Sequence, residues 1–277
     1  MNSTQLNRAL KVSVAAARAV GLLMSRNLNN AKSINSQSLH DIKLELDVRS
    51  QRLITKMLAA EFPDIALLGE EETIGDPTQE YRWVVDPIDG TVNFTYGIPH
   101  ACVSIALQER RKKLSRVLKK GEKPHPDDSY HTILGVVYDP FCNELWTAIE
   151  GKPSRLNNKI TRVSNRKKLS DSIVAMGFAK YEVTLNRMLP VFNLLVHRVL
   201  KIRLLGAAAL SMTWVASGRL DAYKEYGLRL WDIAAAGLII KNAGGEFYYR
   251  PIEGEHTYEL VANNGFIRKE IEKLTKL

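Results

Sequence analysis

The chain has too few cysteines and too little continuous apolar sequence for several large classes of protein. Two cysteines, Cys102 and Cys142, among 277 residues cannot form a disulfide framework, so we expect a reducing, cytoplasmic location. Arg8, Lys11 and Arg18 interrupt the apolar N-terminal stretch, which therefore cannot cross a bilayer, and no secretory signal is recognised. The sequence predicts a protein without a membrane partner.

Common motifs of nucleotide and zinc sites are also missing. There is no Gly-x-Gly-x-x-Gly fingerprint and no P-loop lysine, so a nucleotide cofactor is not indicated. The six histidines show no metal-ligand spacing, and His100 is expected to pack rather than to bind. Neither a nucleotide cofactor nor a histidine metal site is therefore indicated.

Positive charge is abundant, and it is concentrated in one place. The formal net charge is +9, and residues 110–123 contain eight cationic residues but only one acid, Glu122. A basic run can meet nucleic acid or an acidic substrate, although most such runs are solvated surface. We expect an insertion between Leu107 and Ile133 that forms a solvated loop, either mobile or held by a partner, because it has too few apolar residues for a core.

Apolar spacing predicts alternating helices and strands without internal repeats. Helical spacing covers 4–28 and 48–61, and residues 29–41, rich in Asn and Ser, are expected to form a loop. Strands are expected at 65–68 and 83–85, followed by three consecutive antiparallel strands at 101–107, 133–138 and 144–149. Later helices are expected at 185–196, 206–217, 230–242 and 266–274, and later strands at 173–176, 201–205, 220–224, 245–249 and 260–262. This order indicates a layered α+β fold.

Residues 86–94, Asp-Pro-Ile-Asp-Gly-Thr-Val-Asn-Phe, are the most informative segment. The proline stiffens a turn between Asp86 and Asp89, so both carboxylates and the Ile88 carbonyl can face one point, as a hard cation such as Mg²⁺ requires. Gly90 permits close backbone approach, and free N–H groups at a helix start there would bind an anion. Metal ligands beside amides for phosphate are what metal-assisted hydrolysis of a phosphate ester needs.

Three motifs in register resemble those of the inositol monophosphatase family. Residues 86–94 are similar to its first signature, and 231–237 (Trp-Asp-Ile-Ala-Ala-Ala-Gly), followed by Ala-Gly-Gly at 243–245, resemble the second. Residues 68–71 (Leu-Gly-Glu-Glu) resemble the acidic element that precedes both. The resemblance covers almost the whole chain and implies the family's α-β-α-β-α sandwich. We expect a single domain over 1–277, with an N-terminal metal-binding α+β half at 1–170, a basic insertion at 108–132, and a C-terminal α/β half at 171–277.

The resemblance implies a set of metal ligands, namely Glu70, Asp86, the Ile88 carbonyl, Asp89 and Asp232. They would hold two or three Mg²⁺ ions, and the resemblance also implies inhibition by lithium. Without this context, Glu70 would be a solvated surface acid, and Asp232 a first-turn acid that stabilises its helix.

Catalytic roles are implied for Glu70, Asp47 and Thr91. Asp47 would help to place a further metal and its water, with Thr91 as its partner in orienting that water, and the alternative for Asp47 is a helix N-cap. Residues 44–47 read Leu-Glu-Leu-Asp, where the family commonly has Thr-x-x-Asp. The family's loop lysine is displaced, with Lys32 and Lys43 as candidates.

Substrate contacts are implied at a second set of residues, namely Gly90, Thr91, Arg203, Ala208, Glu225 and Asp232. Glu225 stands seven residues before Asp232, as does the family acid that contacts a sugar hydroxyl. Arg203 and Ala208 correspond to residues near the substrate ring. Without this register, a charged residue at a strand end would usually be surface.

The sequence therefore predicts a homodimeric, Mg²⁺-dependent phosphomonoesterase that hydrolyses inositol monophosphate or a related small sugar phosphate through a metal-activated water. Fructose-1,6-bisphosphatase, histidinol-phosphatase and 3′(2′),5′-bisphosphate nucleotidase activities are the alternatives. Val92 and Asn93 stand where nucleotidases tend to carry Lys and Glu, which favours the inositol type. An RNA- or complex-binding factor on a phosphatase scaffold also stays open, although a nucleic-acid partner is not favoured.

Overall fold

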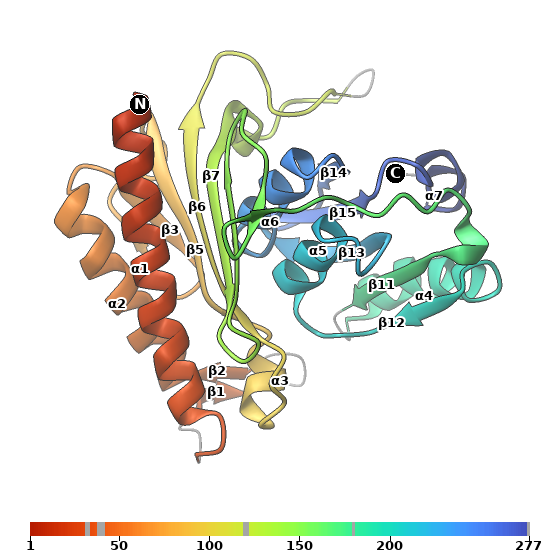
Figure 1. Cartoon of the computed structure of the whole chain (residues 1–277), viewed down its shortest axis with the longest axis horizontal. Coiled ribbons are helices and arrows are strands. Elements are labelled where there is room, and N and C mark those ends of the chain that lie inside the picture. The colour runs from red at the N-terminus through yellow and green to blue at the C-terminus, as the bar shows by residue number, and fades with distance from the viewer. Residues whose placement is uncertain (31–33, 38–41, 119–121, 179–180, 276–277) are drawn as a thin grey trace.

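The computed structural model describes residues 1–30, 34–37, 42–118, 122–178 and 181–275, and of 34–37, 42–44 and 274–275 it describes the backbone alone. The fold has five layers (Figure 1). Helices α1 (Ser3–Asn27) and α2 (Glu45–Glu61) cover one face of an eight-stranded sheet, and α5 (Ala208–Ala216) and α6 (Leu230–Asn242) cover the other. A five-stranded sheet follows, with α4 (Glu182–Val196) and α7 (Arg268–Thr275) outside it. The predicted α-β-α-β-α sandwich is confirmed.

The larger sheet has the strand order β10-β9-β8-β7-β6-β5-β3-β4. Its strands are β3 (Ala66–Gly69), β4 (Thr73–Ile74), β5 (Tyr81–Asp89), β6 (Cys102–Arg110), β7 (Tyr130–Asp139), β8 (Glu144–Ile149), β9 (Arg155–Leu156) and β10 (Lys159–Ile160). As predicted, β6, β7 and β8 are consecutive and antiparallel.

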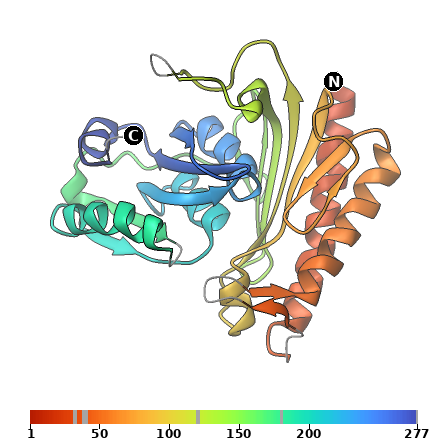
Figure 2. The same cartoon turned by 180° about the vertical axis from the view of Figure 1, so that it is seen from behind.

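The smaller sheet has the order β12-β11-β13-β15-β14. Its strands are β11 (Ile173–Phe178), β12 (Lys201–Arg203), β13 (Ala222–Arg229), β14 (Glu246–Pro251) and β15 (Thr257–Asn263). Helix α6 lies between the two sheets, as the reverse view also shows (Figure 2), and its residues 233–240 are all buried. A helix that is apolar on every side is expected in such a place, because it has no solvent-facing stripe.

Two local predictions are wrong. The stretch 29–41 was expected to be a loop, but it contains β1 (Ile34–Gln37), which pairs with β2 (Ile42–Leu44) in antiparallel register. Lys32 lies outside the described residues, and Lys43 lies in β2 with a side chain that is not described. The Asp-Pro-Ile-Asp segment is not a turn but the end of β5, with a bulge against β6 between Asp86 and Asp89. Proline has no N–H for the strand ladder, and a bulge redirects neighbouring side chains.

The described part of the basic insertion is irregular and none of residues 111–118 is buried, as expected, but its arginines also bind carboxylates of the rest of the chain. Arg111 makes two hydrogen bonds to Glu150, at 3.0 and 2.6 Å. Arg116 binds the buried Asp128 at 2.7 Å, and Asp128 belongs to the short 3-10 helix η1 (Pro126–Ser129) before β7. The carboxylates that neutralise these arginines lie outside the basic run or at its end, so the run's own composition could not show them.

Neither cysteine forms a disulfide. Cys102 is buried in β6, and Cys142 is exposed. In the part of the chain that the structure describes, no helix combines the length and the apolar character needed to span a membrane.

Candidate active site

Most of the predicted site residues line one pocket, which we call the carboxylate pocket. Its volume is about 260 Å³, and both sheets help to form it. Of the predicted residues, it contains Glu70, Asp86, Ile88, Asp89, Gly90, Thr91, Ala208, Glu225 and Asp232. The ends of β3, β5 and β11 meet there with β13 and with the first turns of α3 (Thr91–Thr95), α5 and α6. Strand ends that converge on helix starts are where open α/β sheets commonly bind ligands.

Glu70 is positioned by a buried amide on α2. Strand β3 ends at Gly69, and the Glu70 N–H donates to the Val85 carbonyl at 3.1 Å. The side chain of Gln51 then accepts from the Glu71 N–H at 2.9 Å and donates to the Glu72 carbonyl at 2.7 Å. These bonds fix the backbone of the acidic turn, so that Glu70 lies in the pocket.

Asp89 links the two halves of the chain. Its Oδ1 accepts from the Ala208 N–H at 3.0 Å, and its Oδ2 from the Leu210 N–H at 3.3 Å. The N-cap of α5, Ala207, has no side-chain acceptor of its own. A carboxylate from β5 therefore satisfies the amides that an N-cap Ser or Asp would otherwise bind.

Asp232 and Asp86 are each held by a local backbone N–H. The Arg229 N–H donates to Asp232 Oδ2 at 2.7 Å, in the first turn of α6. The Ile88 N–H donates to Asp86 Oδ1 at 2.9 Å. Asp232 therefore binds an N–H in the first turn of α6, which is the role expected of it without the family resemblance. It also lines the pocket.

The residues after Asp89 form a tight corner. Gly90 has φ +91°, and a Cβ there would lie 3.0 Å from the His100 carbonyl oxygen, so glycine is needed. The Thr91 hydroxyl donates to the Ile88 carbonyl at 2.9 Å. Asn93 donates to the carbonyls of His100 and Leu205, at 2.9 and 2.7 Å. The asparagine of the signature therefore joins the corner to the loop before α5, a role that sequence reasoning did not assign.

Glu225 occupies the side of the pocket formed by β11 and β13. It accepts a hydrogen bond from the Tyr223 hydroxyl. Gly177 leaves the space for it, since a Cβ at that position would lie 2.1 Å from Glu225 Oε2. Burial raises the pKa of Glu225 to about 7, against the lowering effect of the Tyr223 hydrogen bond. Sequence reasoning missed Tyr223 and Gly177, since neither belongs to a signature.

Two predicted residues are not brought to the pocket lining. Asp47 is buried in the first turn of α2, at its third residue rather than at the N-cap. Arg203 lies on β12, at the edge of the smaller sheet, and its side chain donates to the Ile202 carbonyl. His100 packs edge-on against Trp214 with ring centroids 5.2 Å apart, as predicted.

The pocket concentrates negative charge. Burial, together with the charges of Glu70, Asp89 and Asp232, raises the pKa of Asp86 well above its usual range. Burial and the charges of Asp89 and Glu70 likewise raise the pKa of Asp232. For Asp89, burial raises the pKa to about 6, although the Ala208 and Leu210 amides act in the opposite direction. None of the described residues that line the pocket is Lys, Arg or His.

This donor set fits a hard divalent cation. Carboxylate and carbonyl oxygens are the ligands that Mg²⁺ prefers, and a cation would relieve the mutual repulsion of the acids. Within the described ranges, no three Asp, Glu, His or Cys side chains yet converge as the ligands of one ion do. Like charges oppose such convergence until a cation lies between them.

Comparison with known proteins agrees with this geometry. The sequence profile of the Inositol monophosphatase family matches residues 5–115 and 128–273, leaving 116–127 of the insertion unmatched. A Nus factor SuhB of Pasteurella multocida is 32% identical over 274 residues, covering 96% of this chain and 95% of the relative. Inositol monophosphatase 1 of Solanum lycopersicum is 33% identical over 250 residues, covering 88% of this chain and 85% of the relative.

Solved structures show the same fold. The extragenic suppressor protein suhB of Bartonella henselae superposes with a TM-score of 0.83 at 30% identity, covering 97% of this chain and 98% of that one. An IMPase of Thermotoga maritima gives 0.80 at 28% identity, covering 97% of both chains. The profile match, the relatives and the shared fold agree, and the chain belongs to the inositol monophosphatase family.

Proposed function

We propose that the chain is a Mg²⁺-dependent phosphomonoesterase for inositol monophosphate or a related small sugar phosphate. One observation carries the proposal: Glu70, Asp86, Asp89 and Asp232 line one pocket, beside Gly90 and Thr91. We assign Glu70, Asp86, the Ile88 carbonyl, Asp89 and Asp232 as ligands of two or three ions. When bound, Mg²⁺ would activate a water and neutralise the charge of the phosphate.

The chain's own residues orient this reaction. The amides of Ala208 and Leu210 fix Asp89, and the Arg229 amide fixes Asp232, so neither carboxylate has to be ordered when substrate binds. Gly90 and Thr91 line the pocket beside them and would contact the phosphate. Asp47 keeps its proposed role in orienting water with Thr91, as a buried acid of α2.

Glu225 is proposed to contact a hydroxyl of the leaving group. It lies in the pocket with Ala208, and the Tyr223 hydroxyl holds one of its oxygens. The conservative change Glu225→Gln should alter the choice among sugar phosphates more than the rate on p-nitrophenyl phosphate. An equal loss on every substrate would contradict this role. Arg203 keeps its proposed role near the substrate ring.

Phosphate release from a panel of substrates tests the function. Inositol monophosphate, fructose 1,6-bisphosphate, histidinol phosphate and adenosine 3′,5′-bisphosphate distinguish the activities that the family fold allows. We expect the highest kcat/KM on inositol monophosphate, loss of activity in EDTA, recovery with Mg²⁺, and inhibition by lithium. Activity that resists both EDTA and lithium would refute the metal assignment.

A second candidate is a complex-binding factor on a phosphatase scaffold. Relatives that cover most of this chain are named Nus factor SuhB, and Lys112, Lys113 and Lys123 are exposed on the insertion. A salt-dependent RNA mobility shift that is lost in Lys112→Gln/Lys113→Gln would support it. The control Asp89→Asn should bind RNA like the wild type, because Asp89 lines the carboxylate pocket and does not belong to the insertion.

The homodimer is proposed to form through α4 and the loop after it. Val183, Leu189 and Leu200 are 62%, 48% and 55% exposed, and we propose that apolar side chains exposed on this segment belong to an interface. Light scattering should give twice the mass of the chain, and Leu189→Glu should give the monomer. We also propose a cytoplasmic location, which the two free thiols support.

A further inference from the structure

A histidine in the loop between β14 and β15 binds the buried acid Asp127 of η1. His256 Nδ1 and Asp127 Oδ2 are 2.6 Å apart, and the imidazole is 16% exposed. Asp127 also accepts from the buried guanidinium of Arg82, and this pairing keeps the carboxyl ionised. An ionised carboxylate only accepts hydrogen bonds, so Nδ1 of His256 carries the hydrogen and donates it.

The backbone of His256 has a conformation that is uncommon outside glycine. Its φ is +48°, in the left-handed region. A residue other than glycine keeps such a conformation only where its surroundings hold it. The imidazole is held by Asp127, and the carbonyl of the next residue, Thr257, accepts from the Ile252 N–H at 2.9 Å. The bond to Asp127 therefore helps to fix the direction of the His256 carbonyl.

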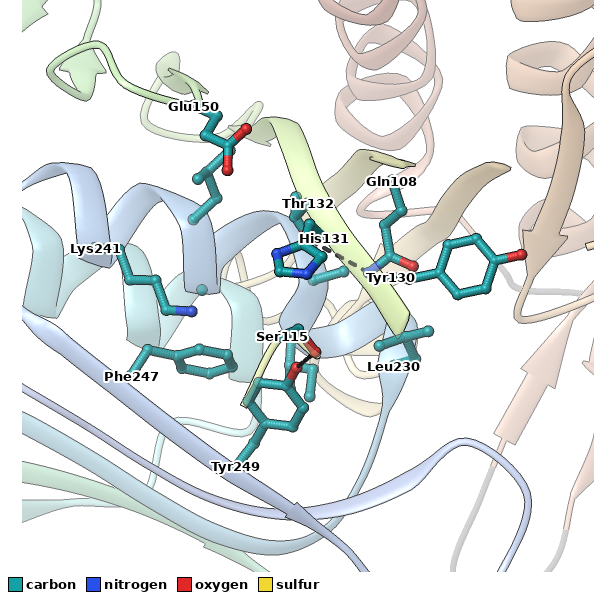
Figure 3. A pocket seen from close by; sticks show the side chains of 14 residues that line it. Gln108, Ser115, Tyr130, His131, Thr132, Glu150, Leu230, Lys241, Phe247 and Tyr249 are labelled. Atoms are coloured by element: carbon teal, nitrogen blue, oxygen red, sulfur yellow. Dashed lines mark hydrogen bonds between the residues drawn. The ribbon is translucent and has the colours of Figure 1, made fainter. Parts of the chain in front are cut away.

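That carbonyl binds the start of α6. The Leu230 N–H donates to the His256 carbonyl at 3.0 Å. Leu230 is the first residue of α6, so its N–H has no acceptor within the helix. Leu230 also lines one pocket with Tyr130, the residue that follows η1, and Figure 3 shows both side chains there. The first turn of α6 therefore lies against the His256 loop and close to η1.

A second set of bonds joins the same loop to Asp232. Arg229 Nη1 donates to the Glu255 carbonyl at 2.5 Å and to the Thr257 hydroxyl at 2.6 Å. The Arg229 N–H in turn donates to Asp232 Oδ2 at 2.7 Å. Asp232 is the third residue of α6, two positions after Leu230. A displacement of the loop would therefore move the backbone that carries and orients this carboxylate.

We propose that His256 is a positioning residue for Asp232, acting through its carbonyl on the first turn of α6 while Asp127 holds its side chain. The inference rests on the proposed function, because it takes Asp232 as a ligand of Mg²⁺. His256 does not line the carboxylate pocket, so its effect on the ion is indirect. Groups that orient metal ligands in this way are typically worth about tenfold to a hundredfold in metal affinity. The end of the insertion gains a role, since η1 supplies Asp127.

Calorimetric titration of the full chain with MgCl₂, without substrate, tests the proposal. His256→Gly removes the imidazole and suits the positive φ, so the loop is not strained by the change. His256→Asn keeps an N–H donor near the position of Nδ1 and also tolerates a positive φ. We expect His256→Gly to bind Mg²⁺ roughly tenfold more weakly than the wild type, and His256→Asn to bind it within about twofold.

The matched control is Asn158→Gly, the same kind of change at φ +67° on the turn between β9 and β10, and it should bind as the wild type does. Thermal unfolding in EDTA checks that each variant is folded at the temperature of the titration. Equal affinity of His256→Gly and the wild type would overturn the positioning role and leave the proposed function in place. An equal loss in His256→Asn and His256→Gly would overturn it too. A wild type that binds no Mg²⁺ would refute the metal assignment and the positioning role together.

A second measurement uses the wild type alone. Coupling between two sites is reciprocal, so Mg²⁺ bound at Asp232 should stabilise the loop that positions it. Hydrogen–deuterium exchange, read on peptides by mass spectrometry, should slow at residues 254–257 when Mg²⁺ is added and should stay the same at 155–160. Exchange at 254–257 that is equal with and without saturating Mg²⁺ would contradict the proposal.

Discussion

Two clusters of buried carboxylates in this molecule differ in how their charge is balanced. Asp127, before β7, accepts from Arg82 at 2.7 Å, from His256 Nδ1 at 2.6 Å and from the Tyr258 hydroxyl at 2.5 Å. Burial alone would raise the pKa of Asp127, but the His256 hydrogen bond and the Arg82 charge hold it well below its usual range. In the carboxylate pocket, burial and neighbouring acids raise the pKa of Asp86 instead.

The difference separates acids that are paired within the fold from acids that we propose bind a ligand. Asp127 joins β5 to β15 through Arg82 and Tyr258, so its cation is part of the chain. Among the described residues that line the carboxylate pocket, none is Lys, Arg or His, and Asp86 instead faces the charges of other acids. Buried like charges are costly, so a fold keeps them where an external cation can compensate.

Asp89→Asn should have the largest effect and nearly abolish turnover. Removal of one charge between the proposed metal sites should lower kcat at least about a hundredfold, because metal charge stabilisation is worth several kcal/mol. Phosphate release at saturating Mg²⁺ measures this. The fold should survive, since the asparagine oxygen can still accept from the Ala208 amide, and circular dichroism checks it. Turnover like that of the wild type would refute the assignment.

Asp127→Asn should leave the carboxylate pocket intact and destabilise the fold. The free energy of unfolding should fall by about 3–5 kcal/mol, because Arg82 would stay buried without its carboxylate. Urea denaturation measures it, and Asp64→Asn, at an exposed position, is the matched control. An equal, small effect of both variants would contradict the role of Asp127.

The difference in unfolding free energy between the wild type and Asp127→Asn should depend on pH. Since the folded-state pKa of Asp127 is depressed, its contribution is complete above the unfolded value of about 4 and is lost as the pH falls below it. The stability difference between wild type and Asp127→Asn should therefore narrow between pH 5 and pH 3, taken here as roughly one unit on either side of that value. A constant difference across this range would oppose the argument.

Arg116→Gln should destabilise by a smaller amount. Arg116 binds the buried Asp128 and also Glu122, so we expect a loss of about 2 kcal/mol, the range of charged hydrogen bonds. The neighbouring change Val117→Ser should have almost no effect, because Val117 is 93% exposed. Thermal unfolding compares the two variants. Equal melting temperatures would mean that the contacts of Arg116 do not stabilise the fold.

Asp86→Asn should change the stability of the metal-free protein least, and it should raise that stability rather than lower it. Without metal, loss of one of the mutually repelling charges should stabilise the protein by about 1 kcal/mol, whereas the same change at Asp127 destabilises it. Thermal unfolding in EDTA measures this. Addition of Mg²⁺ should raise the melting temperature of the wild type only, because the ion stabilises the state that binds it. A lower melting temperature of Asp86→Asn in EDTA would contradict the comparison.

Periodicity predicted the elements that carry a strong apolar pattern. Helix α6 and strand β8 begin and end where predicted, and a glycine follows each within two residues, Gly244 after α6 and Gly151 after β8. The end of β5 could not be predicted, since a bulge depends on how β6 pairs with it. For the same reason the pairing of β1 with β2 is not visible in a stretch of Asn and Ser.

The four acids named from the signatures line one pocket, but the signatures did not indicate the groups that hold them. Asp89 is 119 residues from its amide donor Ala208, and Asp127 is 129 residues from His256. Such contacts form when the layers of the fold pack together. The residues beside each partner in the sequence give no sign of them. Glu70 and Gln51 show the same limit at shorter range, since a glutamine on a helix gives no sign of the turn that it will bind.

The capping of α5 by Asp89 has a consequence for the order in which the chain is made. Synthesis proceeds from the N-terminus, so Glu70, Asp86 and Asp89 leave the ribosome well before α5 and Asp232. Until then, Asp89 lacks the amides of Ala208 and Leu210, and Asn93 lacks the Leu205 carbonyl. A nascent or truncated chain that stops before α5 would carry three of the four acids but no assembled pocket. Nascent chains would therefore lack the assembled pocket until translation has passed Asp232 of the 277 residues.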